Sequence, residues 1–401
     1  MADDETNPAT FCDPPSFSIQ AQGHSLVFLP GGPDRLKALL SLIDGAREQL
    51  CVAFYIFATD ECGARVRDSL AAAARRGVDV HVIVDGFGAV ADAAFFAPLI
   101  DAGGSFCRFA PRWSRRYLIR NHQKIVVVDR TVAMLGGFNV ENSYFEPLGG
   151  DGWSDLAFTV EGPVVARVAD WFAELEAWAR QPGAKFRAIR RKVHQWNGGD
   201  GPVQLLIGGP TRGLSSWARE VCSDLVEGDR LEMIMAYFSP PPRLLRRLCA
   251  IARKGRVRLL FPARSDNGAT IGAARALYGK LLRSGARIWE FQPCKLHTKL
   301  IVLDDTSYLG SANFDMRSLF LNLEIVLKIE DAALAARLRE YFAAHLPASR
   351  EITREIHAAR ATLFNRLRWR LSWFLVTVVD YTVSRKLNLG QGKDWLRERP
   401  W

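Results

Sequence analysis

Apolar positions along this chain follow two different periods, and the change from one to the other predicts alternating strands and helices. Residues 50–57 form an apolar, partly β-branched run that is typical of a strand. Residues 61–76 are rich in Ala and Arg and stop at Gly77, as expected of a helix. Residues 78–85 alternate and predict a second strand. This order predicts an α/β fold with helices on the faces of a central sheet.

The chain also repeats itself at a steady offset, which indicates one fold written twice. Three segments recur at offsets of 177, 178 and 175 residues: 29–33 at 206–210, 74–80 at 252–258, and His122-x-Lys124 at His297-x-Lys299. A period this long predicts two domain-sized halves rather than a solenoid. We therefore expect two duplicated domains, each a central mixed sheet flanked by helices, packed as an α+β-like sandwich with pseudo-twofold symmetry.

Changes in composition suggest where these domains begin and end. The segment between the halves is basic and contains Gly, as a linker does, and the first residues look like a flexible tail. The expected organisation is an N-terminal tail (1–22), a first domain (23–180), a linker (181–201), a second domain (202–345) and a basic amphipathic C-terminal segment (346–401).

Composition narrows the class of protein. The 401 residues are 48% hydrophobic, an ordinary globular balance that excludes a disordered, collagen-like or small disulfide-framed protein. The formal net charge of +10 suggests an anionic partner, which could be nucleic acid, a phosphorylated substrate or acidic lipid. The seven cysteines are scattered without CxxC spacing, so we expect reduced core residues. The acidic N-terminus shows no secretion signal, and no apolar run approaches the roughly 18 residues of a spanning helix.

The repeated segments carry the candidate chemistry. The six candidate catalytic residues share one spacing, His122-x-Lys124-x4-Asp129 and His297-x-Lys299-x4-Asp304, and each motif has strand composition inside it. Strand side chains alternate between faces, so the His and Lys of each pair project together. An imidazole can attack phosphorus or move a proton, and an ammonium can neutralise phosphoryl oxygens. Two copies meeting across an interface would supply a nucleophile and an acid–base; the alternative is two surface pairs on unremarkable strands.

Small and polar residues follow each motif and extend the candidate site. Asn139, Ser311 and Asn313 are candidate donors to phosphate oxygens, and the small residues beside them allow close approach of a ligand. A carboxylate can fix the tautomer and orientation of a catalytic imidazole through its second nitrogen. Asp155 and Glu324 are the candidates for that task, with a solvated loop carboxylate as the alternative for each.

The C-terminal segment has the pattern of an amphipathic helix. Apolar residues recur at helical spacing between positions 363 and 378, while Arg366 and Arg370 fall mostly on the other side. Trp369 and Trp373 are expected as interfacial aromatics. The unbroken apolar run, 371–379, is too short to span a bilayer, so a helix lying in the headgroup plane is the fitting mode. The alternative is a helix packed on the protein's own core.

With its two His-x-Lys-x4-Asp motifs, the sequence resembles the phospholipase D superfamily over nearly its whole length, from about residue 23 to about 344. It looks most like the bacterial cardiolipin synthases of the shorter type that lacks N-terminal membrane helices. Further segments that carry the resemblance are 55–63, 85–88, 120–124, 136–139, 153–155 and 313–324. One departure is Trp153-Ser154-Asp155, where the family usually has Trp-Arg-Asp and therefore one more cation.

The resemblance implies a phosphatidyltransferase that needs neither metal nor cofactor. It would condense two phosphatidylglycerols into cardiolipin and glycerol through a phosphatidyl-histidine intermediate. Family precedent favours His122 as the nucleophile and His297 as the acid–base, although the similar motifs leave the order open. The lysines and asparagines of both halves would hold the phosphoryl oxygens, and Asp129 and Asp304 would be mainly structural.

The same motifs also serve other enzymes, so the substrate must be argued separately. The alternatives are a lipid hydrolase or headgroup-exchanging phospholipase D, and a nuclease, which would show salt-sensitive nucleic-acid binding. The amphipathic C-terminus favours phosphatidylglycerol and anionic membrane lipids as partners, with no nucleic acid. The expected location is peripheral, on the cytoplasmic side of the bacterial inner membrane. The acceptor and the oligomeric state are left open by the sequence.

Overall fold

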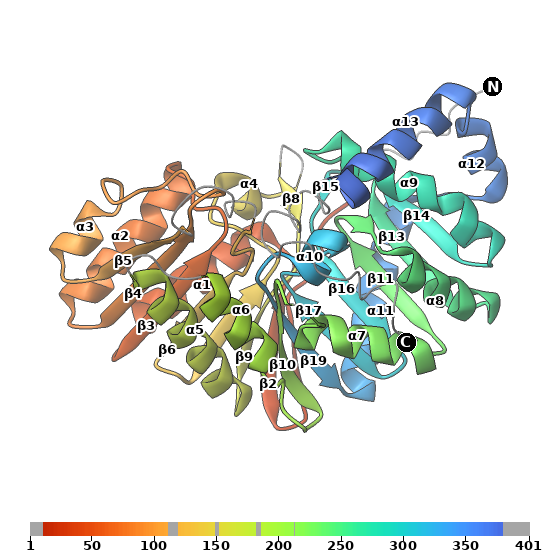
Figure 1. Cartoon of the computed structure of the whole chain (residues 1–401). Coiled ribbons are helices and arrows are strands. Elements are labelled where there is room, and N and C mark those ends of the chain that lie inside the picture. Colours follow the sequence, from red (N-terminus) through yellow and green to blue (C-terminus); the bar gives the residue numbers. More distant parts are fainter. Residues whose placement is uncertain (1–10, 111–118, 149–151, 182–185, 212, 380–401) are drawn as a thin grey trace.

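The computed structural model describes residues 11–379 except 111–118, 149–151, 182–185 and 212. Figure 1 shows the two halves of the chain side by side, each built on its own sheet with helices against it. Within the described residues, both sheets are eight-stranded. The duplicated mixed α/β architecture expected from the sequence is therefore confirmed.

The first sheet has the strand order β1-β2-β9-β7-β6-β3-β4-β5. Strands β3, β4 and β5 run parallel to one another, and the other neighbours pair antiparallel, which makes the sheet mixed. The strands are β1 (Phe17–Ala21), β2 (His24–Leu29), β3 (Gln49–Phe54), β4 (Asp79–Asp85), β5 (Ser105–Phe109), β6 (Ile125–Val128), β7 (Val132–Gly136) and β9 (Ala157–Glu161).

The second sheet repeats this plan in the order β10-β19-β17-β16-β11-β13-β14-β20. Its β11, β13 and β14 are the parallel strands, in the places that β3, β4 and β5 take in the first sheet. The strands are β10 (Val203–Gly208), β11 (Leu231–Met235), β13 (Val257–Pro262), β14 (Arg287–Phe291), β16 (Lys299–Leu303), β17 (Thr306–Gly310), β19 (Glu324–Glu330) and β20 (Ser349–Glu351).

Helices pack on both faces of each sheet, and the buried side chains fall into three clusters. One cluster lies under α1 (Gly32–Gly45), α2 (Glu61–Arg75) and α3 (Ala97–Asp101), and a second under α7 (Ser216–Glu227), α8 (Pro242–Arg253) and α9 (Gly268–Arg283). The third lies between the halves and includes α5 (Val164–Arg180) and α11 (Ala332–Ala344). The halves thus share one continuous core.

The side chains of strand β3, which point alternately to its two faces, explain this layering. Leu50, Val52 and Phe54 of β3 belong to the cluster under α2, whereas Cys51 and Ala53 belong to the cluster between the halves. Both faces of the strand are buried, so its run is continuously apolar. Because the period of a strand is two residues, one strand contributes to two cores.

Three segments differ from the simplest expectation. Phe17–Ala21, placed by the sequence in a flexible tail, forms strand β1 and pairs with β2; residues 1–10 of that tail lie outside the described residues. The expected linker contains α6 (Phe186–Gln195). All seven cysteines are free, and Cys12 is exposed rather than in the core because it precedes the first strand.

The C-terminal segment continues as α12 (Arg354–Arg360), α13 (Leu363–Trp373) and a π-helical turn, η3 (Phe374–Val379), of which α13 lies against α9 (Figure 1). Trp369 is buried and Trp373 packs on the second half, so these indoles are not the exposed interfacial aromatics that the sequence suggested. Residues 380–401 lie outside the described residues. Along the described chain, every helix is too short or too polar to cross a membrane.

Candidate active site

Short backbone pairings across the interface bring the two His-x-Lys motifs together. The two-residue strand β8 (Trp153–Ser154) of the first half pairs in parallel with β15 (Lys295–Leu296) of the second. The amide of His297 donates to the Ser154 carbonyl at 2.7 Å, and the amide of His122 donates to the Leu323 carbonyl at 2.9 Å. Each motif histidine is therefore anchored by the backbone of the opposite half.

Both histidines line one cavity of about 500 Å³. Asn139 and Asn313, two of the three predicted phosphate-binding residues, also line it. Tyrosines and arginines complete much of the remaining wall, namely Tyr55, Tyr144, Tyr237, Arg120 and Arg317. The two imidazoles, which are 175 residues apart in the sequence, thus face the same space.

The buried carboxylates that hold the imidazoles are exchanged between the halves. His122 Nδ1 lies 3.0 Å from Glu324 Oε2, and His297 Nδ1 lies 2.8 Å from Asp155 Oδ2. Both carboxylates are completely buried. Since a carboxylate only accepts hydrogen bonds, each Nδ1 carries its proton toward the carboxylate, and each Nε2 is left with its lone pair.

The two histidines have different surroundings despite the repeat. The ring of His297 packs edge-on against Tyr144 and Trp153, with centroids 5.2 Å from each. The ring of His122 lies against Tyr55, 5.0 Å between centroids. Its partner Glu324 also accepts hydrogen bonds from the hydroxyls of Ser311 and Ser318. His297 therefore has the more aromatic environment, and His122 is held by the more extensive hydrogen-bond network.

Both motif lysines are buried beside the histidines. Lys124 Nζ donates to the His122 carbonyl at 2.6 Å, and Lys299 Nζ donates to the His297 carbonyl and lies 2.9 Å from His297 Nδ1. Burial lowers the pKa of Lys124 to about 7 and that of Lys299 to about 8. Their positive charges are thus only partly retained near neutral pH while the cavity is empty.

Burial also lowers the pKa of both imidazoles, because it disfavours their charged forms. The pKa of His122 falls to about 4 and that of His297 to about 3, with the neighbouring lysines contributing to both shifts. Burial alone would raise the pKa of Asp155, but His297, Lys299 and Arg35 outweigh it and hold the value at about 2. Near neutral pH the empty site therefore contains two neutral imidazoles, each beside an ionised carboxylate.

Ser311 lies elsewhere than the sequence suggested. Its hydroxyl donates to Glu324 and accepts from the Ile325 amide, and it is not part of the cavity wall. In the first half the equivalent position is Gly137, where an added Cβ would lie 2.7 Å from Asp155 Oδ1. This position therefore accommodates the carboxylate that holds a histidine. Gly137 leaves space for Asp155, and Ser311 donates a hydrogen bond to Glu324.

Asp129 and Asp304 are not brought to the cavity. Asp129 follows β6 with a φ of 50°, and its carboxylate accepts from the amides of Arg47, Glu48 and Gln49. Asp304 follows β16 with a φ of 49° and accepts from the amides of Asp229 and Arg230. Asp tolerates this left-handed conformation better than most residues, and both carboxylates fasten a strand end to a neighbouring loop.

Two residues that the sequence analysis did not single out support the site. Tyr144 places its hydroxyl 3.5 Å from His297 Nε2, on the cavity side of that ring. Arg35 is fully buried and donates to the main-chain carbonyls of Tyr144, Trp153 and Asp155, so it holds the backbone that carries the Asp155 carboxylate. Neither has a spacing that distinguishes it, so only the folded chain reveals these contacts.

Comparison with known proteins gives consistent relatives. A family described as "Cardiolipin synthase, PLD-like domain" matches residues 39–176 and 224–346. Cardiolipin synthase A of Pseudomonas fluorescens is 33% identical over 82% of this chain and 69% of its own length. Cardiolipin synthase A of Cronobacter sakazakii is 32% identical over 88% of this chain and 75% of its own length.

Solved structures show the same fold. The phosphatidylserine synthase of Haemophilus influenzae superposes with a TM-score of 0.70 at 17% identity, covering 92% of this chain and 96% of that one. A polyphosphate kinase of Porphyromonas gingivalis gives a TM-score of 0.52 at 13% identity, over 80% of this chain and 50% of that one. At these identities the likeness concerns the fold alone.

Proposed function

Since the chain belongs to the phospholipase D-like cardiolipin synthase family, we propose that it is a phosphatidyltransferase that condenses two phosphatidylglycerols into cardiolipin and glycerol. The observation that carries this proposal is that two neutral imidazoles line the same cavity, each held at Nδ1 by a carboxylate of the opposite half. One Nε2 lone pair can attack phosphorus while the other ring handles protons.

In the first proposed step, His122 Nε2 attacks the phosphorus of one phosphatidylglycerol. The new P–N bond forms as the bond from phosphorus to the glycerol oxygen breaks, and His297 Nε2–H protonates the departing alkoxide. His297 must therefore be charged when substrate is bound, although its pKa is low in the empty site. The anionic phosphodiester supplies this change, because a negative charge beside the ring favours the imidazolium.

In the second proposed step, neutral His297 takes the proton from a hydroxyl of the second phosphatidylglycerol. That oxygen attacks phosphorus as the P–N bond breaks, which returns His122 to its neutral form. Lys124 and Lys299 would balance the phosphoryl charge, and Asn139 and Asn313 line the cavity where they can donate to its oxygens. Glu324 and Asp155 would stabilise whichever ring is charged at each step.

The product of the reaction distinguishes this proposal from hydrolysis. Purified protein is incubated with vesicles of labelled phosphatidylglycerol, and the lipids are resolved by mass. We expect cardiolipin and glycerol in equal amounts. Phosphatidic acid alone would show that water is the acceptor and would make the chain a hydrolase. Cleavage of single-stranded DNA with no lipid product would make it a nuclease.

Affinity for the substrate should fall as the pH rises. Lowered pKa values mean that Lys124 and Lys299 lose their charges between about pH 7 and 8, well below the usual range of lysine. Phosphatidylglycerol keeps one negative charge throughout, so its attraction to the cavity weakens. In the His122→Ala variant, which cannot turn the lipid over, we expect binding of short-chain phosphatidylglycerol to weaken roughly tenfold between pH 6.5 and 9. Adding Lys124→Met should make this dependence shallower, because only Lys299 then titrates in this range. Affinity that increases with pH would contradict the proposed lysine roles.

We further propose that the chain works at the bacterial inner membrane as a peripheral protein, on its cytoplasmic side. The support is the exposed apolar row of α13 and η3, which includes Leu363, Leu367 and Leu371. Such a row is typical of a helix that lies in the headgroup plane. The substrate would then enter the cavity from the membrane, since Leu375 and Val376 of η3 line that cavity.

A further inference from the structure

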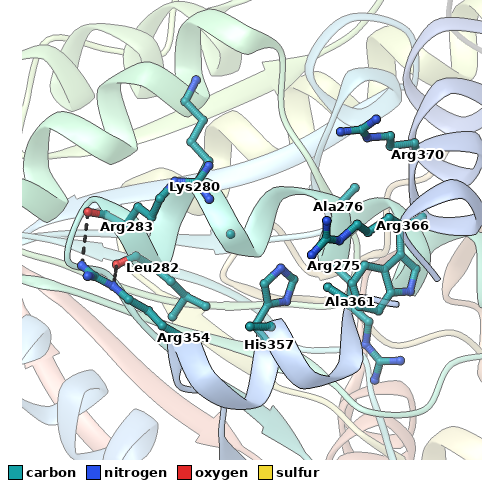
Figure 2. A pocket seen from close by; sticks show the side chains of 13 residues that line it. Arg275, Ala276, Lys280, Leu282, Arg283, Arg354, His357, Ala361, Arg366 and Arg370 are labelled. Carbon is teal, nitrogen blue, oxygen red and sulfur yellow. Dashed lines mark hydrogen bonds between the residues drawn. The ribbon is translucent and has the colours of Figure 1, made fainter. Parts of the chain in front are cut away.

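A second cavity, separate from the catalytic one, lies between α9, α12 and α13. Its volume is about 420 Å³, and its lining shares no residue with that of the catalytic cavity. Figure 2 shows basic side chains projecting around it from all three helices. We call this cavity the basic pocket; its charged lining is Arg275, Lys280, Arg283, Arg354, Arg366 and Arg370.

The charge of the basic pocket is not balanced from within. Among the described residues, it is lined by these six cations and by His357, and by no Asp or Glu. Arg275 is paired with Glu290, and Arg354 caps the carbonyl end of α9 at Leu282 and Arg283. Along the described chain, the side chains of Lys280, Arg366 and Arg370 have no such partner. A concave site with unpaired cations fits an anion.

Two neighbouring groups make the site suited to phosphate. His357 stacks on Trp369, and burial together with Arg283 lowers the pKa of this histidine, as expected beside uncompensated cations. The indole Nε1 of Trp369, which also lines the basic pocket, is buried with no acceptor among the described residues. Unsatisfied buried donors are uncommon in native proteins, and an anionic oxygen would satisfy this one.

The surroundings of the basic pocket indicate what carries the phosphate. Of the ten exposed large apolar side chains in the described part of the chain, six lie at positions 363–375, in α13 and η3. Leu363 and Phe364 are 85% and 73% exposed, so no described part of the chain covers this end of the row. Cations beside an exposed apolar helix face match an anionic leaflet, whose charged headgroups would contact the cations and whose acyl region would take up the apolar side chains.

We propose that the basic pocket binds the phosphate-bearing headgroup of an anionic phospholipid while the apolar row of α13 and η3 enters the acyl region. The bound lipid is not the substrate, because the basic pocket lies apart from His122 and His297. It orients the protein: α13 leads into η3, whose Leu375 and Val376 border the catalytic cavity. A lipid held beside α13 therefore sets the catalytic mouth against the leaflet from which substrate is drawn.

Vesicle binding by the full chain tests this site directly. Sedimentation with vesicles of phosphatidylglycerol and phosphatidylcholine is compared for the unchanged protein and for Arg366→Gln/Arg370→Gln. Both arginines are exposed, so the fold should tolerate the change. We expect the double variant to bind at least about tenfold more weakly, given the usual contribution of a cation at an anionic surface. Binding to pure phosphatidylcholine should be weak for both.

A matched control removes the same charge elsewhere. Arg246 and Arg253 are exposed on α8 and lie outside the basic pocket. Arg246→Gln/Arg253→Gln should retain most of the affinity. An equal loss for both pairs would show diffuse attraction of a basic protein and would overturn the site. Melting temperatures of both variants should match that of the unchanged protein.

Two further arms separate other occupants of the same surfaces. Inorganic phosphate at millimolar concentration should not raise the melting temperature of the unchanged protein. The ligand would be free phosphate if phosphate raised that temperature, if Arg366→Gln/Arg370→Gln abolished the rise, and if the same double variant still bound vesicles normally. Phe364→Gln/Leu367→Gln should weaken vesicle binding. If it instead dissociated a dimer seen without lipid, the row would be a contact between copies. Either result would overturn the lipid assignment.

The readout is binding, so it is independent of the proposed reaction. A chain that binds these vesicles through the basic pocket but forms no cardiolipin would contradict the proposed function and leave this inference standing. Conversely, normal turnover in detergent by the Arg366→Gln/Arg370→Gln variant, together with unchanged vesicle binding, would overturn the inference alone.

Discussion

His122→Ala and His297→Ala should each reduce cardiolipin formation by about four orders of magnitude or more. Removing a positioned acid–base alone typically costs 10² to 10⁴ in rate, and removing a nucleophile abolishes the covalent route. Both rings line one cavity, and among the described residues no third histidine lines it that could replace either of them. The measurement is initial rate on phosphatidylglycerol vesicles, with thermal melting to show that each variant is folded.

The leaving group separates the two proposed roles. Phosphatidyl-p-nitrophenol releases an anion that needs no proton, so the first step no longer depends on a general acid. We expect His297→Ala to recover a burst of p-nitrophenol with this substrate, whereas His122→Ala should not. The opposite pattern would exchange the roles of the two rings. Substantial activity of either variant on phosphatidylglycerol itself would contradict a shared site.

The repeat explains how much of the site could be predicted from sequence. His122 and Lys124 lie two residues apart directly before strand β6. His297 and Lys299 have the same spacing where strand β16 begins, so each pair is expected to project together. The period of the repeat predicts two such strands in two similar sheets. The placement of the two motifs is encoded by local spacing and duplicated in register, so this part of the candidate site could be predicted from the sequence.

The pairing of carboxylates with imidazoles could not be predicted in the same way. Asp155 follows the first motif and Glu324 follows the second, yet each contacts the histidine of the other half. This exchange depends on how β8 meets β15 and how Asn121 meets Leu323, which are contacts between the halves. No pattern within one half specifies them. Ser311 illustrates the same limit, since its small polar side chain fits a phosphate donor and a partner for Glu324 equally well.

The C-terminal helix shows a different limit, set by the choice of face. Its periodicity predicted an amphipathic helix, and the row from Leu363 to Leu375 is indeed the exposed face. The sequence placed Trp369 with that surface because indoles favour interfaces. In the fold, α13 instead rests on α9 through Trp369 and Ser372, close to Gly272, where the absence of a side chain leaves room. Packing against a specific neighbour overrode the general preference of the residue.

Burial makes the two proposed protonation roles compatible in one cavity. An imidazole in water would be partly charged near neutral pH, and its charged fraction could not attack phosphorus. Here burial lowers the pKa of both rings, so the empty site is ready for attack. The ionised carboxylates, whose pKa values stay low, allow either ring to become charged once an anionic substrate is present. Burial thus keeps each ring neutral in the empty site, and the carboxylate stabilises its charged form once substrate is bound.

The exchanged carboxylates lead to the most specific expectation for the site. Asp155→Asn should lower turnover by about 10² to 10⁴, because an amide in place of the carboxylate favours the wrong tautomer of His297 and no longer stabilises its charge. Although Asp155 belongs to the same half as His122, its variant should behave like His297→Ala. It should therefore recover the p-nitrophenol burst, and Glu324→Gln, which acts on His122, should not. Ser318→Ala removes only one hydroxyl from Glu324 and serves as a mild control. If Asp155→Asn instead lost the burst while Glu324→Gln kept it, each carboxylate would serve the histidine of its own half, and the crossed arrangement would be wrong.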